Sequence, residues 1–391
     1  MKTFMSLVKP RPGDVAAIVS PSAGLPGLFP WVHELGLRRL QDEFGLVPRE
    51  YPTTRRMGAS YADRARDLTA AFADPEVKVV ISSIGGEDEI GLIKHLDPDV
   101  FVAHPKPFFG YSDNTNLHNL LWTHHIPSFY GGSTMVQLGM PGGMHPETVR
   151  SLRHALFETG TVEVEVAREF TEVELDWADP ANLGRHRPME PNEGLIWDGD
   201  ADAEGTLWGG CLEVLFGVLA TGRFLPSDDD LDGAVLYIET SEEIPSPFAV
   251  GYFLTALGER GWLERFAGVL VGRPKAWSLP KPNDDPTRVA YRQAHRDAVL
   301  TSVRAYNSAI PIVMNLDFGH TDPQVIVPSG GLARISASTR QVFLTDRSDA
   351  PVERGRVMSL GDMYEAAWDE FAPDQPVRGL TVKDGLTDEA W

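Results

Sequence analysis

Apolar runs that alternate with helical patterns through the first third of the chain constrain the fold most strongly. Short apolar segments with the length and composition of buried strands occur at 14–20, 77–84 and 106–110. Segments with apolar residues at helical spacing occur between or after these strands, at 32–44, 61–72 and 115–122. Such alternation is typical of right-handed βαβ units, so we expect an α/β fold with an N-terminal domain built on a parallel sheet.

The pattern changes near residue 162, and the stretch at 176–200 is rich in Pro, Gly, Asn and Trp. Further on, helix candidates at 212–220 and 247–260 mix with the expected strands, which are 234–239, 268–271, 310–316 and 341–344. This mixture predicts a second, mixed α/β domain that is rich in strands. We expect four parts: the N-terminal α/β domain at 1–168, a linker and substrate loop at 169–200, the C-terminal domain at 201–350, and an acidic extension at 351–391 with a helix at 358–371.

Charge and cysteine content limit the partners and the compartment. The chain has 35 Lys and Arg against 56 Asp and Glu, a net charge of −21, which argues against nucleic acid or an anionic membrane as the main partner. One cysteine, Cys211, permits neither an intrachain disulfide nor a Cys-based zinc site. The first apolar stretch is interrupted by Lys9 and Pro10, and no run reaches the length of a membrane helix. We therefore expect a soluble cytoplasmic protein.

One segment, FFGYSDNT at 108–115, runs from an apolar strand through a tight turn into a helix. This is the layout of a nucleophile elbow, in which Ser112 is held at the strand end beside a helix N-terminus that favours developing negative charge. Asn114 stands where the common G-x-S-x-G elbow has its last glycine, which disfavours an ordinary α/β-hydrolase. The alternative is a helix cap, with Ser112 or Asp113 accepting backbone N–H bonds, and the motif alone favours the cap.

A serine nucleophile needs a base, and the base needs an orienting acid. Among 11 histidines, His320 follows an apolar strand and the turn 317–319, which would place it at the sheet edge where α/β sites gather. A structural histidine remains the alternative. Glu239 ends another apolar strand, where a carboxylate needs a partner. Glu242 and Glu243 follow in a proline-containing turn and are interpreted as solvated loop residues.

Gly85 and Gly86 end the strand at 77–84 and let backbone amides approach a ligand closely. This pair can supply an oxyanion donor beside the amide of Asp113, and a plain turn is the alternative. Neither a phosphate-binding glycine motif nor an HExxH motif is present in the sequence. The sequence therefore offers no signature of a phosphate cradle, and it contains no cluster that we interpret as a metal site.

Ten sequence pieces, taken in order, resemble one family. They are PGD at 12–14, IVSPSAG at 18–24, ADRARDL at 62–68, AFADP at 71–75, GG at 85–86, GYSD at 110–113, GG at 209–210, LYIET at 236–240, GVLVGR at 268–273 and DFGHT at 317–321. Together they resemble the serine peptidases that comprise the LD-carboxypeptidases and the microcin C immunity proteins. The resemblance covers about residues 10–340.

The resemblance implies a Ser-Glu-His triad. It implies Ser112 as nucleophile, His320 as general base and then acid, and Glu239 as the group that orients the imidazole. It also implies that the amides of Gly86 and Asp113 form the oxyanion hole. An N-terminal α/β domain, a mixed C-terminal domain, the absence of metal and cofactor, and a homodimer are further implications.

Within the family, the stretch at 236–247 and the long loop at 176–200 look more like the MccF branch. That branch cleaves an amide bond in aminoacyl-nucleotide conjugates. It places a loop tryptophan against the nucleobase of the substrate. Trp177 and Trp197 lie in the corresponding region; we favour Trp177, and packing between domains is the alternative for both. The family often has Asn after the second GG pair, whereas this chain has Cys211, whose thiol cannot replace an amide in binding substrate.

The sequence thus predicts a serine peptidase or amidase that acts through an acyl-enzyme on a small peptide or an aminoacyl-nucleotide conjugate. One alternative is an LD-carboxypeptidase that acts on muropeptide tetrapeptides in cell-wall recycling. The alternative of another class is a non-catalytic protein that binds a ligand in the same pocket.

Overall fold

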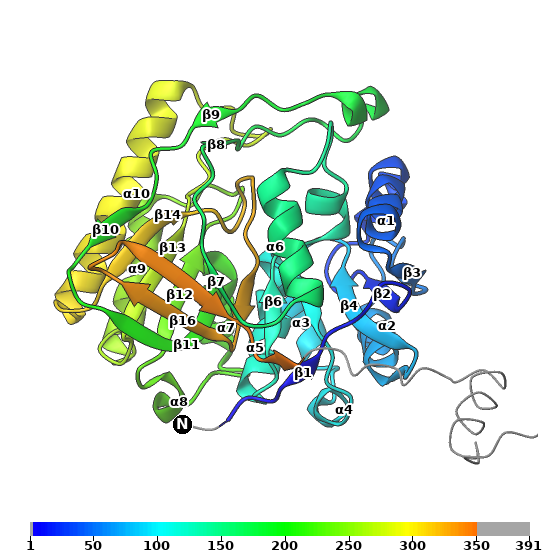
Figure 1. The fold of residues 1–391 in the computed structure, drawn as a ribbon, viewed down its shortest axis with the longest axis horizontal. Coiled ribbons are helices and arrows are strands. Elements are labelled where there is room, and N and C mark those ends of the chain that lie inside the picture. The colour runs from blue at the N-terminus through cyan, green and yellow to red at the C-terminus, as the bar shows by residue number, and fades with distance from the viewer. Residues whose placement is uncertain (1–2, 350–391) are drawn as a thin grey trace, which may run out of the picture. The chain divides into compact units, whose positions relative to one another are not determined.

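The computed structural model describes residues 3–349. The extension expected at 351–391, with its helix at 358–371, lies outside the described residues. Figure 1 shows the two large sheets of the described part of the chain, which also contains two two-stranded ladders. Each large sheet contains strands from both sides of the expected boundary at 168, and both carry residues of the candidate site.

The smaller sheet is the α/β core expected from the first third of the chain. Its strands are β2 (Val15–Val19), β3 (Val47–Glu50), β4 (Val77–Ser82), β5 (Phe108–Gly110), β6 (Ser128–Tyr130) and β15 (Val327–Ser329). They lie in the order β15-β6-β5-β4-β2-β3, and all neighbours are parallel except β15, which runs antiparallel to β6. The prediction of a parallel-sheet N-terminal region is therefore confirmed.

The helices of this region include the three predicted at 32–44, 61–72 and 115–122, and three that were not predicted, at Glu89–Ile93, Pro98–Ala103 and Pro146–Phe157. In chain order the helices are α1 (Pro30–Phe44), α2 (Tyr61–Ala73), α3 (Glu89–Ile93), α4 (Pro98–Ala103), α5 (Thr115–Thr123) and α6 (Pro146–Phe157), with short turns η1 (Leu25–Gly27), η2 (Ser112–Asn114) and η3 (Thr134–Leu138). The Ser60 side chain caps α2 by accepting from Asp63 N at 3.1 Å. Gly45 ends α1 with a φ of 69°, a left-handed conformation that glycine adopts without strain.

The larger sheet is mixed, as expected for the second half of the chain. Its strands are β7 (Thr161–Glu163), β10 (Ile196–Asp198), β11 (Ala203–Cys211), β12 (Val235–Glu239), β13 (Gly268–Gly272), β14 (Ile312–Leu316), β16 (Leu332–Ser336) and β17 (Gln341–Thr345). The order is β10-β14-β13-β12-β11-β16-β17-β7, in which β11 to β14 are parallel and the other pairs antiparallel. Parallel strands at its centre bring the ends of β12 and β14 to one edge.

Four helices accompany the larger sheet: α7 (Leu212–Thr221), α8 (Asp228–Leu231), α9 (Pro247–Glu259) and α10 (Asp285–Tyr306). The sequence analysis did not predict α10, which has 22 residues and is the longest helix in the described part of the chain. Its start signals were nevertheless present, because Asp284 accepts from Thr287 N at 3.0 Å and a proline lies in the first turn.

The segment expected to be a linker contains short paired pieces. A two-stranded ladder joins β8 (Glu169–Phe170) to β9 (Glu190–Pro191), with η4 (Pro180–Gly184) between them. Figure 1 shows this segment passing over the top of the larger sheet near α10. Its buried Glu172 accepts from Arg288 Nε at 2.6 Å and from Arg292 Nη1 at 2.7 Å, so α10 holds the segment in place.

Strands cross the expected domain boundary in both directions. β7 precedes residue 168 but belongs to the larger sheet, and β15 follows residue 201 but belongs to the smaller one. At the start and end of the described chain, β1 (Leu7–Val8) pairs with β18 (Ser348–Asp349). The boundaries of the four expected parts stay a prediction.

Hydrogen bonds between α5 and β11 join the two sheets. Trp122 Nε1 donates to Leu207 O at 2.9 Å, and Trp208 Nε1 donates to Asn119 Oδ1 at 3.0 Å. Both indoles are buried. None of the helices within residues 3–349 combines the length and apolarity that a bilayer span requires.

Candidate active site

Ser112 stands on a strained turn at the end of β5. Its φ is 62°, a left-handed value that costs a non-glycine residue about 1–3 kcal/mol and is typical of functional positions. Gly85 lies against it, since a Cβ on Gly85 would be 2.9 Å from Ser112 Cβ and 3.2 Å from Ser112 Oγ. The strand–turn–helix layout predicted from FFGYSDNT is therefore present, and the first glycine of the pair makes room for it.

The amides of Gly86 and Asp113 border the same cavity as Ser112. Among the hydrogen bonds of residues 3–349, none uses the N–H of either residue. The Asp113 side chain fixes this turn, because it accepts from Glu89 N at 2.8 Å and from the Ser22 hydroxyl. Burial raises the pKa of Asp113, and the Ser22 hydrogen bond partly offsets the rise. Two unpaired N–H groups beside a serine hydroxyl are what an oxyanion hole requires.

His320 and Glu239 meet at the edge of the larger sheet. Nδ1 of His320 lies 2.7 Å from Oε2 of Glu239, and the Glu239 side chain is fully buried. Gly319, with a φ of 97°, allows this approach because a Cβ there would collide with the Glu239 carboxylate. The carboxylate thus orients the ring through Nδ1–H and directs Nε2 away from itself.

Tyr130 connects this pair to the elbow. Its hydroxyl donates to Glu239 Oε1 at 2.5 Å and accepts from Ser112 N at 3.2 Å. Burial and the neighbouring Glu239 charge raise the pKa of Tyr130 well above its usual value, so the hydroxyl remains a donor. The sequence analysis missed Tyr130; the only signal was a tyrosine at the end of an apolar run, next to Gly131 and Gly132.

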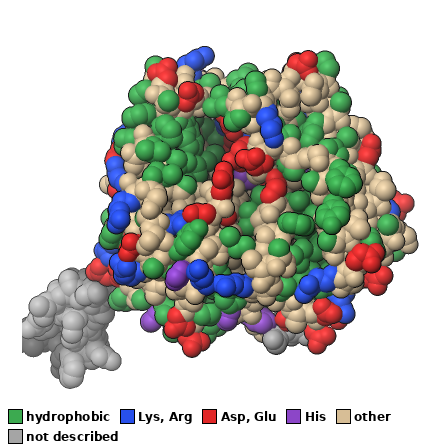
Figure 2. Space-filling view, turned by 180° about the vertical axis from the view of Figure 1, so that it is seen from behind, with side chains coloured by type: hydrophobic (Ala, Val, Ile, Leu, Met, Phe, Trp, Pro, Cys, Tyr) green, Lys and Arg blue, Asp and Glu red, His purple; other side chains and the backbone are tan. Residues whose placement is uncertain are grey.

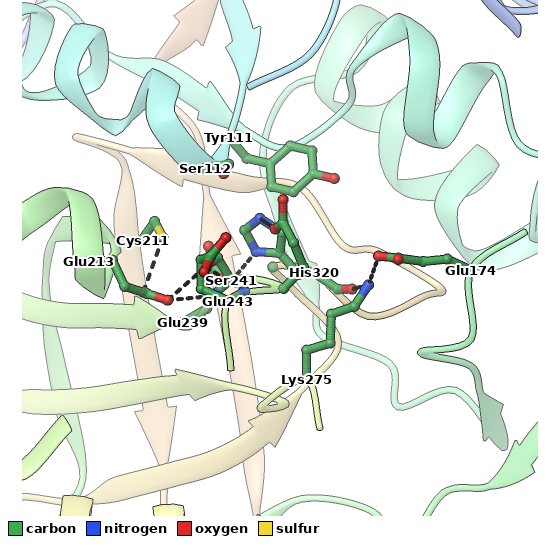
Figure 3. Close-up of polar contacts among 12 residues, drawn as sticks. Tyr111, Ser112, Glu174, Cys211, Glu213, Glu239, Ser241, Glu243, Lys275 and His320 are labelled. Atoms are coloured by element: carbon green, nitrogen blue, oxygen red, sulfur yellow. Dashed lines mark hydrogen bonds and ion pairs between the residues drawn. The ribbon is translucent and has the colours of Figure 1, made fainter. Parts of the chain in front are cut away.

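Other groups surround the His320 ring (Figure 3). Nε2 lies 3.2 Å from Glu242 Oε2, and the Tyr111 ring packs with its centroid 5.0 Å away. Lys275 Nζ donates to His320 O at 3.4 Å and pairs with Glu174 at 2.6 Å. Figure 3 shows Tyr111 and Ser112 on one side of the imidazole and the Lys275–Glu174 pair on another.

Two carboxylates determine the charge of His320. Burial acts to lower its pKa, but Glu239 and Glu242 outweigh burial and raise the pKa from 6.5 to about 9. The Glu242 side chain is half exposed, as a solvated loop residue would be, but its contact with the imidazole was not predicted. Within residues 3–349, no hydrogen bond joins Ser112 Oγ to His320.

The cavity beside Ser112 has a volume of about 740 Å³ and an acidic lining. Arg64 is the cation in that lining, and it is engaged by Asp88 at 2.9 Å. Figure 2 shows a hollow in one face of the molecule with acidic side chains gathered beside it. The carboxyl groups of the cavity lining are those of Glu87, Asp88, Asp113, Glu213, Glu242 and Glu243.

Cys211 lies in this lining, next to Glu213. Its thiol donates to Glu213 Oε2 at 3.4 Å, while Ser241 donates to Glu213 Oε1 from Oγ at 2.7 Å and from N at 3.0 Å. Burial raises the pKa of the Cys211 thiol, and burial together with the Glu239 charge raises the pKa of Glu213. Cys211 is therefore a neutral, weakly polar group at the position that the resemblance associates with substrate binding.

The two candidate tryptophans lie elsewhere. The Trp177 carbonyl accepts from Trp31 Nε1 at 2.8 Å, and its ring packs edge-on against Phe29 with centroids 5.8 Å apart. Trp197 pairs with Val313 between β10 and β14, and the Arg340 guanidinium covers its ring at 5.4 Å. Neither tryptophan is among the residues that line the cavity beside Ser112. Their contact with substrate stays a prediction.

Comparison with known proteins identifies the class. Residues 16–131 match the LD-carboxypeptidase N-terminal domain, and residues 204–335 match the LD-carboxypeptidase C-terminal domain. The chain therefore belongs to the LD-carboxypeptidase family of serine peptidases. This family, together with the carboxypeptidase names of the relatives, supports a serine-type carboxypeptidase or amidase.

The matched relatives include proteins named as carboxypeptidases and proteins named MccF or MccF-like. A Bacillus subtilis protein named "Probable murein peptide carboxypeptidase" is 26% identical over 88% of this chain and 97% of its own length. The microcin self-immunity protein MccF of Escherichia coli is 23% identical over 73% of this chain and 78% of its own. The solved MccF-like protein from Streptococcus pneumoniae, in complex with AMP, is 29% identical with a TM-score of 0.75 and covers 85% of this chain and 98% of its own.

MccF itself has the same fold. Its structure in complex with aspartyl sulfamoyl adenosine has a TM-score of 0.74 at 20% identity, and the alignment covers 88% of this chain and 99% of that one. These matches confirm the α/β architecture predicted from the sequence and the predicted family.

Proposed function

We propose that this protein is a serine hydrolase with Ser112, His320 and Glu239 as its triad. His320 Nε2 takes the proton of Ser112 Oγ as the hydroxyl attacks the scissile carbonyl carbon, and Glu239 keeps the imidazole oriented through Nδ1. The observation that carries the proposal is the 2.7 Å contact of His320 with buried Glu239, in a chain of the LD-carboxypeptidase family.

The remaining steps use groups already described. The N–H groups of Gly86 and Asp113 donate to the oxyanion of the tetrahedral intermediate. The imidazolium of His320 then protonates the leaving amine, which leaves Ser112 acylated. The neutral imidazole then deprotonates a water that attacks the ester carbonyl carbon, and the resulting imidazolium protonates Ser112 Oγ as the ester C–O bond breaks and the acid is released. These residues supply every proton transfer, so we propose a reaction without cofactor or metal.

For the substrate we propose a small peptide or an aminoacyl-nucleotide conjugate that is cleaved at an amide bond. The cavity of about 740 Å³ has the size of a small-molecule site, and the Streptococcus pneumoniae relative binds AMP. MccF binds aspartyl sulfamoyl adenosine, an aminoacyl-nucleotide analogue, which supports the same class.

A second candidate substrate is a muropeptide tetrapeptide. The carboxylate-rich lining favours it, because the diamino acid of such a peptide carries a cationic amine that these groups can pair with. The murein-peptide name of the Bacillus subtilis relative supports the same alternative.

We also propose a cytoplasmic homodimer. Phe248 and Tyr252 support the dimer, because they form an exposed aromatic pair on α9 with ring centroids 6.1 Å apart and exposed fractions of 79% and 59%. Aromatic pairs of this kind are typical of protein interfaces.

A comparison of Ser112→Ala with the unchanged enzyme tests the mechanism. Both are assayed with an aminoacyl sulfamoyl adenosine and with a muropeptide tetrapeptide. We expect Ser112→Ala to lower kcat for the better of the two substrates by about a thousandfold or more. The circular dichroism spectrum of the variant should be unchanged. Undiminished hydrolysis by the variant would contradict the mechanism. Cleavage of the tetrapeptide alone would select the second candidate substrate. A third outcome is that the substrate binds but is not hydrolysed and that a serine-directed fluorophosphonate does not label the protein. This outcome would indicate a non-catalytic binding protein.

A further inference from the structure

We propose that Glu242 is a positioning residue that holds His320 in a resting state and must release it before Ser112 is activated. This inference rests on the proposed function, because it concerns when the general base becomes available. It adds a residue outside the triad, because the Glu242 carboxylate determines whether Nε2 of His320 is bonded to Glu242 or is free to accept the proton of Ser112.

The contacts of the imidazole carry the inference. Nδ1 lies 2.7 Å from Glu239 and Nε2 lies 3.2 Å from Glu242, so each ring nitrogen faces a carboxylate. A carboxylate accepts hydrogen bonds, and both nitrogens donate only in the imidazolium form. An Nε2 that carries a proton has no lone pair to accept the Ser112 proton. The contact with Glu242 and the activation of Ser112 are therefore mutually exclusive.

The charged and titratable groups around His320 favour this resting state. From β12 and the turn after it come Glu239 and Glu242, and from the segment after β13 comes Lys275, which is already paired with Glu174. The Tyr111 ring packs against the imidazole and the Tyr130 hydroxyl contacts Glu239, and burial raises the pKa of both tyrosines well above its usual value, so both are neutral. Although burial acts to raise it, the pKa of Glu242 is lowered because the His320 charge lies beside it. Glu242 and His320 thus form an ion pair near neutral pH.

Glu242 and Glu239 differ in their freedom to leave the ring. The Glu239 side chain is fully buried, and both of its oxygens are hydrogen-bonded. The Glu242 side chain is 50% exposed, and it lines the cavity beside Ser112 from the turn between β12 and α9. A substrate that fills this cavity therefore displaces Glu242 from Nε2, or pairs with it, while Glu239 keeps its place. Binding and activation of the base are coupled in this way.

The test uses Glu242→Gln and, as matched control, Glu243→Gln, which removes a charge from the next residue without a contact to the ring. The rate of inactivation by a fluorophosphonate is measured from pH 5 to pH 10, because this probe reports on Ser112 in the free enzyme. In the unchanged enzyme we expect a midpoint near 9, the pKa of His320. We expect Glu242→Gln to lower the midpoint by a unit or more, which raises the rate at pH 7 by about tenfold per unit.

Glu243→Gln is expected to leave the midpoint in place. Coincident midpoints for Glu242→Gln and the unchanged enzyme would overturn the inference, and so would a lower rate at every pH without a shift. Histidine-selective NMR gives a second readout, with the His320 signal assigned by comparison with His320→Gln. If no variant is labelled, the proposed function fails, while the NMR titration still decides whether Glu242 raises the pKa of His320.

Discussion

At the scale of single residues, one hydroxyl group joins the two halves of the candidate site. Tyr130 accepts from the backbone of Ser112 and donates to Glu239, which lies 109 residues further along the chain. The elbow therefore cannot move relative to the acid without breaking a hydrogen bond in a buried environment. Loss of the Tyr130 hydroxyl leaves a buried carboxylate oxygen of Glu239 without its hydrogen-bond donor.

Tyr130→Phe removes this hydroxyl and keeps the ring. We expect kcat/KM to fall by about tenfold or more, because an unmade buried hydrogen bond to a charged group costs about 1.5–3 kcal/mol. The control is Tyr306→Phe, which removes a similar hydroxyl bonded to Glu259 at 2.8 Å on the surface. The measurement is the kcat/KM of both variants from steady-state kinetics. Equal kcat/KM values would show that Tyr130 has no positioning role.

Three residues were singled out as candidates from the sequence because each stands at the end of an apolar run, and the family resemblance, not the local pattern, implied their catalytic roles. They are Ser112, Glu239 and His320, and the structure brings His320 onto Glu239. Tyr130 and Glu242 were missed because their importance depends on what folds against them. No local pattern distinguishes Glu242, which contacts the ring, from Glu243, which does not.

At the scale of elements, α10 holds the segment at 169–200, which lies between β7 and β11 of the larger sheet. The fully buried Glu172 accepts from Arg288, from Arg292 and from Ala276 N, the last at 2.5 Å. Further ion pairs join Arg288 to Glu190 and Arg296 to Glu193. The sequence analysis missed α10 because its apolar stripe is narrow, with long arginines that cover the segment rather than a hydrophobic face.

Glu172→Gln removes the buried charge between two arginines. We expect the free energy of unfolding to fall by about 3 kcal/mol, because Arg292 then loses the carboxylate that compensates its charge, while Arg288 keeps Glu190. Glu193→Gln is the control, since Glu193 is 56% exposed and exposed pairs contribute about 0–1 kcal/mol. Urea unfolding of both variants measures the difference. Equal losses would contradict the anchoring role of Glu172.

At the scale of the whole described unit, the candidate site lies where the two sheets meet. Ser112 follows β5 of the smaller sheet, whereas Glu239 ends β12 and His320 follows β14 of the larger sheet. The fold class was predictable because strand–helix alternation is local. The exchange of β7 and β15 between sheets was not, because pairing partners far apart in sequence leave no periodic signal.

Trp122→Phe tests the connection between the sheets. It removes the donor to Leu207 O, which we expect to cost about 1–3 kcal/mol of stability and to lower kcat/KM as well. The control is Trp262→Phe, which removes a bond to Asp228 on the larger-sheet side only. We expect that control to lower stability and leave kcat/KM unchanged. Parallel losses of activity in both variants would refute a specific role for the contact between the sheets.

The placement of β15 has a consequence for how the protein is made. β6 carries Tyr130 and pairs with β15 through Val327 to Ser329, so the edge of the first-synthesised sheet is completed nearly 200 residues later. A nascent chain on the ribosome therefore emerges with its nucleophile turn translated but with one flank of that sheet still open. The candidate site can form only after β15 and His320 have been synthesised. An open strand edge is also a site of aggregation, so this interval is when chaperones have the most to protect.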